Sequence, residues 1–387
     1  MEGHSHWPAF EISTVLLTRQ VEVSEQFYES PRSIFRHSEK RVSGVQNLRK
    51  NTLTVLGFNR GLGMNDVIES QRRQLEHPHS INKPTPDTTR HVYNSHEPAM
   101  NGGSFTHNNT VAPNEKSVFS LLSLKGKTAI ISGAGAGIGL RVAQAFAEAG
   151  ANVAIWHHSN KAAITRAQEI ETTYAVKCRA YQVDVTHDST VKEAIDAIVD
   201  EFNGRLDIFV ANAGIPWTQG PMLDGDNGHY RKVVTTDLDG TFYCAKYAGQ
   251  HWRRQKHERT TSHGEPLEGF RYGSFIATAS MSAHIVNVPQ LQAAYNAAKA
   301  GIIHLVKSLA VEWVQFARAN TISPGYMATE ISDFIPPETK NIWRDKIPMG
   351  REGEPHELKG AYLFLASDAS SYTTGTDIIC DGGYCLP

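Results

Sequence analysis

A glycine-rich turn between an apolar run and an amphipathic stretch constrains the fold of this chain most strongly. The run Lys127–Ser132 is short and β-rich, and the glycines follow it as Gly133-x-x-x-Gly137-x-Gly139. Across residues 141–150, apolar side chains recur at helical spacing. Glycine lets the backbone approach a phosphate, and a helix N-terminus offers free N–H groups. A glycine cluster alone indicates only a tight turn, but a strand, turn and helix together predict a dinucleotide site.

The alternation of apolar runs and amphipathic stretches continues along the chain. Asn152–Trp156 and Arg179–Val185 are predicted strands, Thr190–Phe202 is a predicted helix, and Leu206–Gly214 is a buried strand that ends in a polar turn. Strands alternating with helices imply a parallel sheet covered on both faces. We therefore predict an α/β fold with a Rossmann-type, doubly wound sheet. Ligands collect at the carboxyl ends of such strands.

A tyrosine and a lysine four residues apart, Tyr295 and Lys299, lie in the second half of the chain. Residues at this spacing share one face of a helix. A lysine cation beside a tyrosine favours the phenolate form, and a general acid/base works best when it titrates near the working pH. The pair predicts a proton donor and acceptor for a carbonyl/alcohol couple.

The end of the second predicted strand indicates which dinucleotide is bound. In such folds an Asp or Glu about 20 residues beyond the glycines holds the ribose 2′-OH and selects NAD. The stretch His157–Lys161 has no carboxylate there to repel a 2′-phosphate. Ser159, Lys161 and Arg141 could contact that phosphate, or they could be exposed loop residues. We predict NADP as the cofactor.

Bulk composition bears on partners and location. The net charge of −2 gives no basis for a nucleic-acid or membrane-surface partner, and no apolar run reaches the length of a membrane span. The cysteines show no metal-ligand spacing, so we expect no metal site and reduced thiols in a cytoplasmic protein. The four are Cys178, Cys244, Cys380 and Cys385.

The chain divides into two unequal parts, 1–113 and 114–387. Residues 72–113 are rich in His, Asn, Pro, Thr and Ser, a composition that buries little apolar surface. We therefore predict that the first part is a largely disordered N-terminal extension. Three interpretations stay open: a solvated tail, a targeting segment, and translation that starts at Met100.

Ordered motifs across the second part resemble the short-chain dehydrogenase/reductase superfamily over about residues 114–387. The motifs are Gly133-x-x-x-Gly137-Ile138-Gly139, Asp184-Val185, Asn212-Ala-Gly214, Ser280, Tyr295-x-x-x-Lys299, Pro324-Gly325 and Asp381-Gly-Gly383. The resemblance implies a sheet of about seven strands. It implies cofactor binding by Gly133, Gly137, Ile138, Gly139, Asp184, Asn212, Gly214, Tyr295, Lys299, Pro324, Gly325 and Thr329.

A narrower resemblance is to the fungal NADP-dependent mannitol dehydrogenases, sorbose reductases and xylulose reductases. Ala279–Gln290, Ala310–Trp313, Ser323–Tyr326 and Ser370–Gly375 carry it. It implies an enzyme that interconverts a ketose and a sugar alcohol without a metal. It also implies a homotetramer that assembles through helices at about 228–254 and 293–317.

Two positions remain open within this resemblance. Aligning the strand before the tyrosine helix makes Ser280 the catalytic serine, whereas counting back from the tyrosine makes it Ser282. Many family members carry an Asn where this chain has Asp237, which either replaces that Asn in a proton relay or is only a helix residue near the site. Residues 330–350 fit a mobile lid.

Two rival functions are also consistent with the sequence. One is an NADPH-dependent reductase of other ketones, such as aryl ketones or β-keto acyl groups. The other is a non-catalytic NADP-binding sensor or scaffold, although the intact Ser280, Tyr295 and Lys299 argue against it.

Overall fold

The computed structural model describes residues 100–101, 103–107, 110–114, 117–332 and 335–387. The predicted N-terminal extension lies largely outside these described residues. A short antiparallel pair, β1 (Met100–Asn101) and β2 (Ser104–Phe105), comes first, followed by the short helix α4 (Val118–Leu122).

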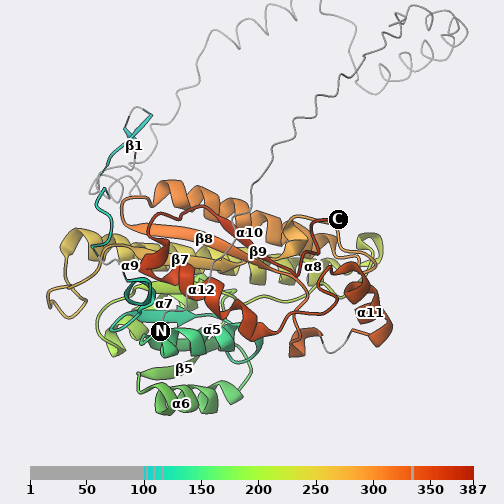
Figure 1. The fold of residues 1–387 in the computed structure, drawn as a ribbon, viewed down its shortest axis with the longest axis horizontal. Helices are drawn as coiled ribbons and strands as arrows, with labels where there is room; N and C mark the ends of the chain where they lie inside the picture. Colours follow the sequence, from blue (N-terminus) through green and yellow to red (C-terminus); the bar gives the residue numbers. More distant parts are fainter. Residues whose placement is uncertain (1–99, 102, 108–109, 115–116, 333–334) are drawn as a thin grey trace, which may run out of the picture. The chain divides into compact units, whose positions relative to one another are not determined.

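The core of the fold is a seven-stranded parallel sheet in the order β5-β4-β3-β6-β7-β8-β9 (Figure 1). Its strands are β3 (Thr128–Ile131), β4 (Asn152–His157), β5 (Cys178–Gln182), β6 (Ile208–Ala211), β7 (Gly273–Thr278), β8 (Ala317–Pro324) and β9 (Asp377–Cys380). Every residue of β3, β6 and β7 is buried, as expected for parallel strands covered on both faces. The predicted Rossmann-type sheet is confirmed.

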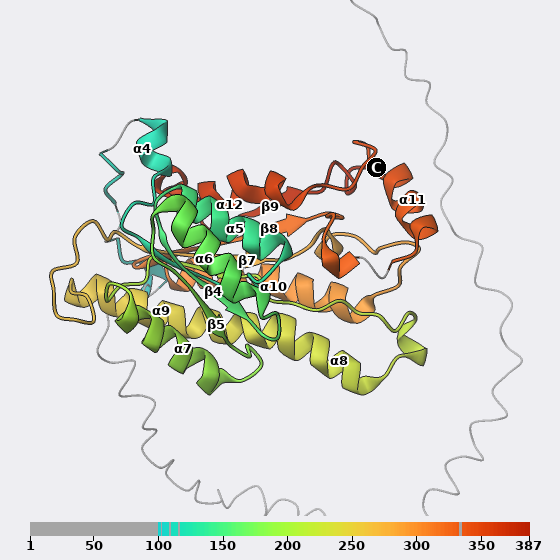
Figure 2. The same cartoon turned by 90° about the horizontal axis from the view of Figure 1, so that it is seen from below.

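Helices cover both faces of the sheet (Figure 2). One apolar cluster joins the sheet to α5 (Gly137–Glu148), α6 (Ala162–Tyr174) and α12 (Lys359–Ala366). A second cluster joins the other face to α7 (Asp188–Glu201), α9 (Gly240–Glu258) and α10 (Ala293–Glu312). The remaining helices are α8 (Asn227–Val234) and α11 (Pro337–Lys346). Among the described residues, no helix has the length and hydropathy to span a bilayer.

The strand order places a crevice beside β3. From β3 the chain runs outward to β4 and β5, then returns to β6 on the other side of β3. Loops that leave β3 and β6 therefore diverge at their carboxyl ends, where doubly wound sheets bind ligands. The glycine turn directly follows β3, so this arrangement positions it at the crevice.

Several element ends differ from the sequence prediction, among them those of β5 and α10. β5 ends at Gln182 rather than at Val185, because the backbone and hydroxyl of Thr186 donate to the Asp184 carboxylate and turn the chain toward α7. α10 ends at Glu312 rather than near residue 317, because Ala317 already belongs to β8.

Short irregular helices complete the fold. A π-helical segment, Thr235–Asp239, joins α8 to α9. The 3₁₀ segments are η1 (Met222–Asp224), η3 (Met281–Ala283), η4 (Glu330–Ser332), η5 (Pro355–Leu358) and η6 (Asp368–Ser370).

Candidate active site

A pocket of about 460 Å³ lies at the carboxyl ends of the strands. Most of the residues named from the sequence line it: Gly133, Gly137, Ile138, Asn212, Gly214, Ser280, Tyr295, Lys299, Pro324, Gly325 and Thr329. Gly139 and Asp184 are not among its lining residues. Segments far apart in sequence therefore meet at one cavity.

The turn after β3 requires its glycines. Gly133 and Gly137 have φ of 64° and 54°, where a side chain would be strained. A Cβ at Gly139 would lie 2.5 Å from the Gly133 carbonyl oxygen. Gly139 thus permits close packing beneath the turn rather than contact with the pocket.

The N-terminus of α5 is open to an anion. Its N-cap, Ala136, makes no side-chain hydrogen bond, and its first turn holds no acidic residue. The first N–H groups of a helix lack intrahelical partners, and the helix dipole favours negative charge there. Together with the glycine turn, this end of the pocket fits a dinucleotide pyrophosphate.

The end of β4 forms another wall of the pocket. His157, His158, Ser159 and Asn160 all line it, without a carboxylate. Burial, and to a lesser extent the neighbouring His158, lowers the pKa of His157. Asn160 donates to the Gly135 carbonyl at 3.3 Å, which ties this wall to the glycine turn.

Other residues predicted near the nucleotide have different roles. The Arg141 guanidinium donates to Gln144 on the surface, and neither it nor Lys161 lines the pocket. Burial would raise the pKa of Asp184, but hydrogen bonds from Thr186 lower it below its usual value. This carboxylate lies 3.7 Å from His158 Nε2.

The Asn212 side chain forms hydrogen bonds across the crevice. Its amide nitrogen donates to the carbonyls of Ser132 and Gly133 at 3.2 Å, and its oxygen accepts from the Thr278 hydroxyl at 3.1 Å. The side chain therefore links β3, β6 and β7 at their carboxyl ends. Asn212 lines the pocket, but its polar atoms are occupied within the protein.

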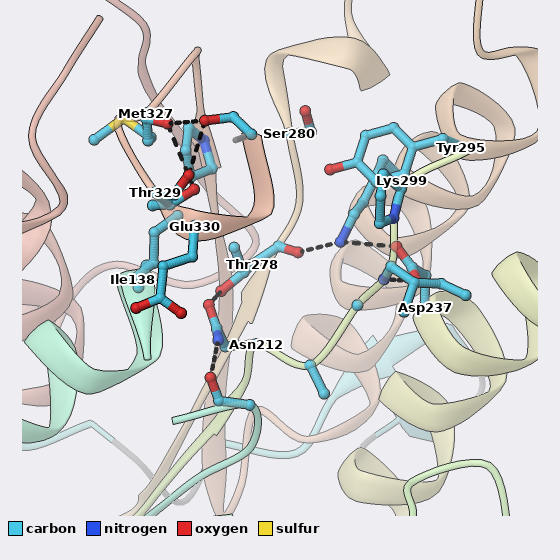
Figure 3. Close-up of a pocket in the computed structure, with 18 of the residues that line it drawn as sticks. Ile138, Asn212, Asp237, Thr278, Ser280, Tyr295, Lys299, Met327, Thr329 and Glu330 are labelled. Carbon is cyan, nitrogen blue, oxygen red and sulfur yellow. Dashed lines mark hydrogen bonds and ion pairs between the residues drawn. The ribbon is translucent and has the colours of Figure 1, made fainter. Parts of the chain in front are cut away.

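Tyr295 and Lys299 project from the same face of α10, as predicted. Lys299 Nζ lies 5.4 Å from the centre of the Tyr295 ring. It donates to the Thr278 carbonyl at 3.1 Å and pairs with Asp237 Oδ2 at 3.2 Å (Figure 3). An ammonium has three N–H donors, so these two contacts leave at least one for the pocket.

The Asp237–Lys299 pair is buried, with side-chain exposures of 0% and 4%. Burial would lower the pKa of Lys299, but the Asp237 carboxylate raises it above its usual value. Asp237 Oδ1 also accepts from the Ile215 amide at 2.8 Å, which anchors the loop after β6. Asp237 therefore contacts the site directly and is more than a nearby helix residue.

Both candidate serines lie in the pocket. The Ser280 hydroxyl accepts from the Ser282 amide at 3.1 Å. The Ser282 hydroxyl accepts from Gln292 Nε2 at 3.0 Å, and the same nitrogen donates to Asn287 Oδ1 at 2.7 Å. Ser282 is thus bound into a side-chain network, whereas Ser280, which follows β7, lies in the pocket with Tyr295 (Figure 3).

Sequence reasoning missed three contributors to the site. The Thr278 carbonyl accepts from Lys299, a role that no residue type signals. Gln292 is the N-cap of α10 and lines the pocket. Trp343 on α11 stacks on Tyr326, with ring centres 3.8 Å apart. The place of Gln292 three residues before Tyr295, where the tyrosine helix begins, could have indicated its position.

The chain matches known proteins over the part that builds this pocket. Residues 133–385 match the family described as enoyl-(acyl carrier protein) reductase. L-xylulose reductase of Hypocrea jecorina is 65% identical over 288 residues, which cover 74% of this chain and 100% of that relative. The chain belongs to the short-chain dehydrogenase/reductase family. As a member of that family, it is an oxidoreductase.

Other relatives agree with this assignment. A probable NADP-dependent mannitol dehydrogenase of Yarrowia lipolytica is 56% identical, over 70% of this chain and 92% of its own length. The crystal structure of an NADPH-dependent 3-quinuclidinone reductase from Rhodotorula rubra covers 74% of this chain and all of its own, at 41% identity and a TM-score of 0.66.

The described residues also show whether the chain could hold a metal ion or a disulfide. Within the described residues, no group of three or more His, Cys, Asp or Glu side chains is placed to hold a metal ion. All four cysteines are free thiols.

Proposed function

We propose that this short-chain dehydrogenase/reductase interconverts a ketose and a sugar alcohol with NADP(H). The observation that carries the proposal is one pocket that joins an anion-accepting glycine turn to Ser280, Tyr295 and Lys299. The names of its relatives, an L-xylulose reductase and a mannitol dehydrogenase, supply the substrate class. The substrate pairs would be of the fructose/mannitol, sorbose/sorbitol or xylulose/xylitol type.

In ketose reduction, Tyr295 acts as the general acid that protonates the carbonyl oxygen. Ser280 donates a hydrogen bond to that oxygen and orients it. Lys299, held by Thr278 and Asp237, stabilises the phenolate that remains on Tyr295. When bound, the reduced cofactor supplies the hydride. The reverse reaction oxidises the sugar alcohol, with the Tyr295 phenolate as the base.

We assign the cofactor to the wall formed by the glycine turn and the end of β4. The absence of a carboxylate at His157–Asn160 supports NADP over NAD, and two relatives are named for NADP or NADPH. The proposed cofactor contacts are Gly133, Gly137, Ile138, Asn212, Gly214, Tyr295, Lys299, Pro324, Gly325 and Thr329. Gly139 supports the cofactor site by allowing close packing beneath the glycine turn. Asp184 supports it through its contact with His158, which lines the pocket.

Several further expectations accompany this function. We place the catalytic domain at residues 114–387, with 1–113 as an extension whose role we leave open. We also propose a homotetramer in the cytoplasm. Exposed apolar side chains on α8, α9 and α10, namely Tyr230, Phe242 and Val311, support helix-mediated assembly.

The proposed function is tested by NADPH oxidation at several ketones. We expect turnover with xylulose, fructose or sorbose, and much weaker turnover with an aryl ketone such as acetophenone. Turnover of the aryl ketone without any ketose would favour a reductase of other ketones, as the 3-quinuclidinone reductase name suggests. NADPH binding without turnover of any ketone would favour a binding protein.

A further inference from the structure

Gln292 occupies the pocket in a way that the proposed chemistry does not use. It is 7% exposed and lines the pocket one turn before Tyr295. Gln292 is the N-cap residue that precedes the first turn of α10, and it lines the same pocket as Ser280 and Tyr295.

The hydrogen bonds of Gln292 fix its orientation. Nε2 donates to Ser282 Oγ at 3.0 Å and to Asn287 Oδ1 at 2.7 Å. Both amide hydrogens are therefore engaged, and the amide oxygen is left to accept a hydrogen bond. Asn287 is held in turn, because its own nitrogen donates to the Tyr326 hydroxyl at 3.2 Å.

The same network is connected to the reacting end of the pocket. The Ser280 hydroxyl accepts a hydrogen bond from the Ser282 amide. Ser282 therefore links Gln292 to Ser280. Ser280, Ser282, Gln292 and Tyr295 line one pocket, so a substrate whose carbonyl oxygen lies at Ser280 and Tyr295 can direct its neighbouring oxygen toward Ser282 and Gln292. An open-chain ketose carries a hydroxyl at that position.

We infer that Gln292 is the specificity-determining residue of this site: its amide oxygen accepts a hydrogen bond from the hydroxyl next to the ketose carbonyl. This inference rests on the proposed function and assigns to one residue its preference for a ketone that carries a neighbouring hydroxyl. A site that hydrogen-bonds a substrate hydroxyl disfavours an analogue that lacks it, because the buried polar group is then unpaired. The hydrogen bonds from Gln292 to Ser282 and Asn287 restrict the movement of its amide oxygen, so the oxygen cannot easily reach another hydrogen-bond donor.

The test compares L-xylulose with 2-pentanone, which has the same carbon chain and no hydroxyl. We expect Gln292→Met to lower kcat/KM for L-xylulose by about ten- to a hundredfold, with 2-pentanone little changed. Gln292→Glu keeps an acceptor oxygen and, as the protonated carboxyl that burial favours, one donor for the Ser282 and Asn287 network, so it should retain more of the preference for xylulose than Gln292→Met. The matched control is Gln219→Met, an exposed position outside the pocket, which should behave like the parent enzyme.

Thermal melting and NADPH binding establish that each variant is folded, and Gln292→Glu provides the comparison if Gln292→Met does not fold. Equal losses for L-xylulose and 2-pentanone, or an unchanged preference in Gln292→Met, would overturn the inference while leaving the proposed function intact. Loss of the preference in Gln292→Glu as well as in Gln292→Met would also count against the acceptor role. A parent enzyme that reduces no ketose would overturn both.

Discussion

At the residue scale, the contact between Asp237 and Lys299 is the strongest electrostatic feature of the site. Two opposite charges lie 3.2 Å apart, almost without exposure to solvent. Removing one partner of such a pair leaves an uncompensated buried charge. The carboxylate therefore has two functions: it compensates Lys299, and it holds the Ile215 amide beside the pocket.

Replacing Asp237 with Asn should move the alkaline limb of the pH–rate profile. Asp237 raises the pKa of Lys299 against the effect of burial, so without this charge Lys299 loses its proton at lower pH. Activity that depends on the lysine cation should therefore decline about one pH unit or more earlier as pH rises. The measurement is kcat/KM for sugar-alcohol oxidation across pH.

Asp239→Asn is the control for this prediction. It makes the same chemical change in the same π-helical segment, at a residue that does not line the pocket. An alkaline limb that stays in place in Asp237→Asn, or moves equally in Asp239→Asn, would contradict the role assigned to the buried pair.

Residue types revealed part of this site in advance. Tyr295 and Lys299 were evident because four-residue spacing fixes a common helix face. The partners of Lys299 were less evident, because one is the backbone carbonyl of Thr278 and the other comes from a distant π-helical segment. The Gln292 network was missed for the same reason, since Ser282 and Asn287 reach it through tertiary packing.

At the element scale, we assign cofactor selection to the carboxyl end of β4. A carboxylate there should repel a 2′-phosphate and accept a hydrogen bond from a 2′-hydroxyl. We expect His157→Asp to lower the NADPH-to-NADH ratio of kcat/KM by about tenfold or more, since a like-charge contact is worth at least about 1 kcal/mol. Steady-state kinetics with both cofactors measures the ratio, and an unchanged value would contradict the assignment.

The elements themselves followed from periodicity. Strands such as β4 were placed almost to the residue, because buried parallel strands are continuously apolar and bounded by turns. The residues at which helices and strands end were harder to predict. Asp184 does not line the pocket, and hydrogen bonds from Thr186 turn the chain there, a turn that sequence spacing does not encode.

At the scale of the whole molecule, the sheet order brings distant segments to one pocket. The glycine turn after β3 and the tyrosine of α10 are far apart in sequence, and the parallel topology places both at the carboxyl edge. Fold class was predictable because alternating elements admit few topologies, whereas the strand number was implied by the family resemblance. The substrate depends on side chains within the pocket, and composition says little about these.

The most direct test of the central claim is ketose reduction by Tyr295→Phe, followed as NADPH oxidation. This change removes one hydroxyl and retains the ring beside Lys299. We predict that kcat falls by at least about a hundredfold while NADPH binding, measured by fluorescence, stays near that of the parent. Turnover close to the parent level would show that Tyr295 is not the proton donor and would contradict the account.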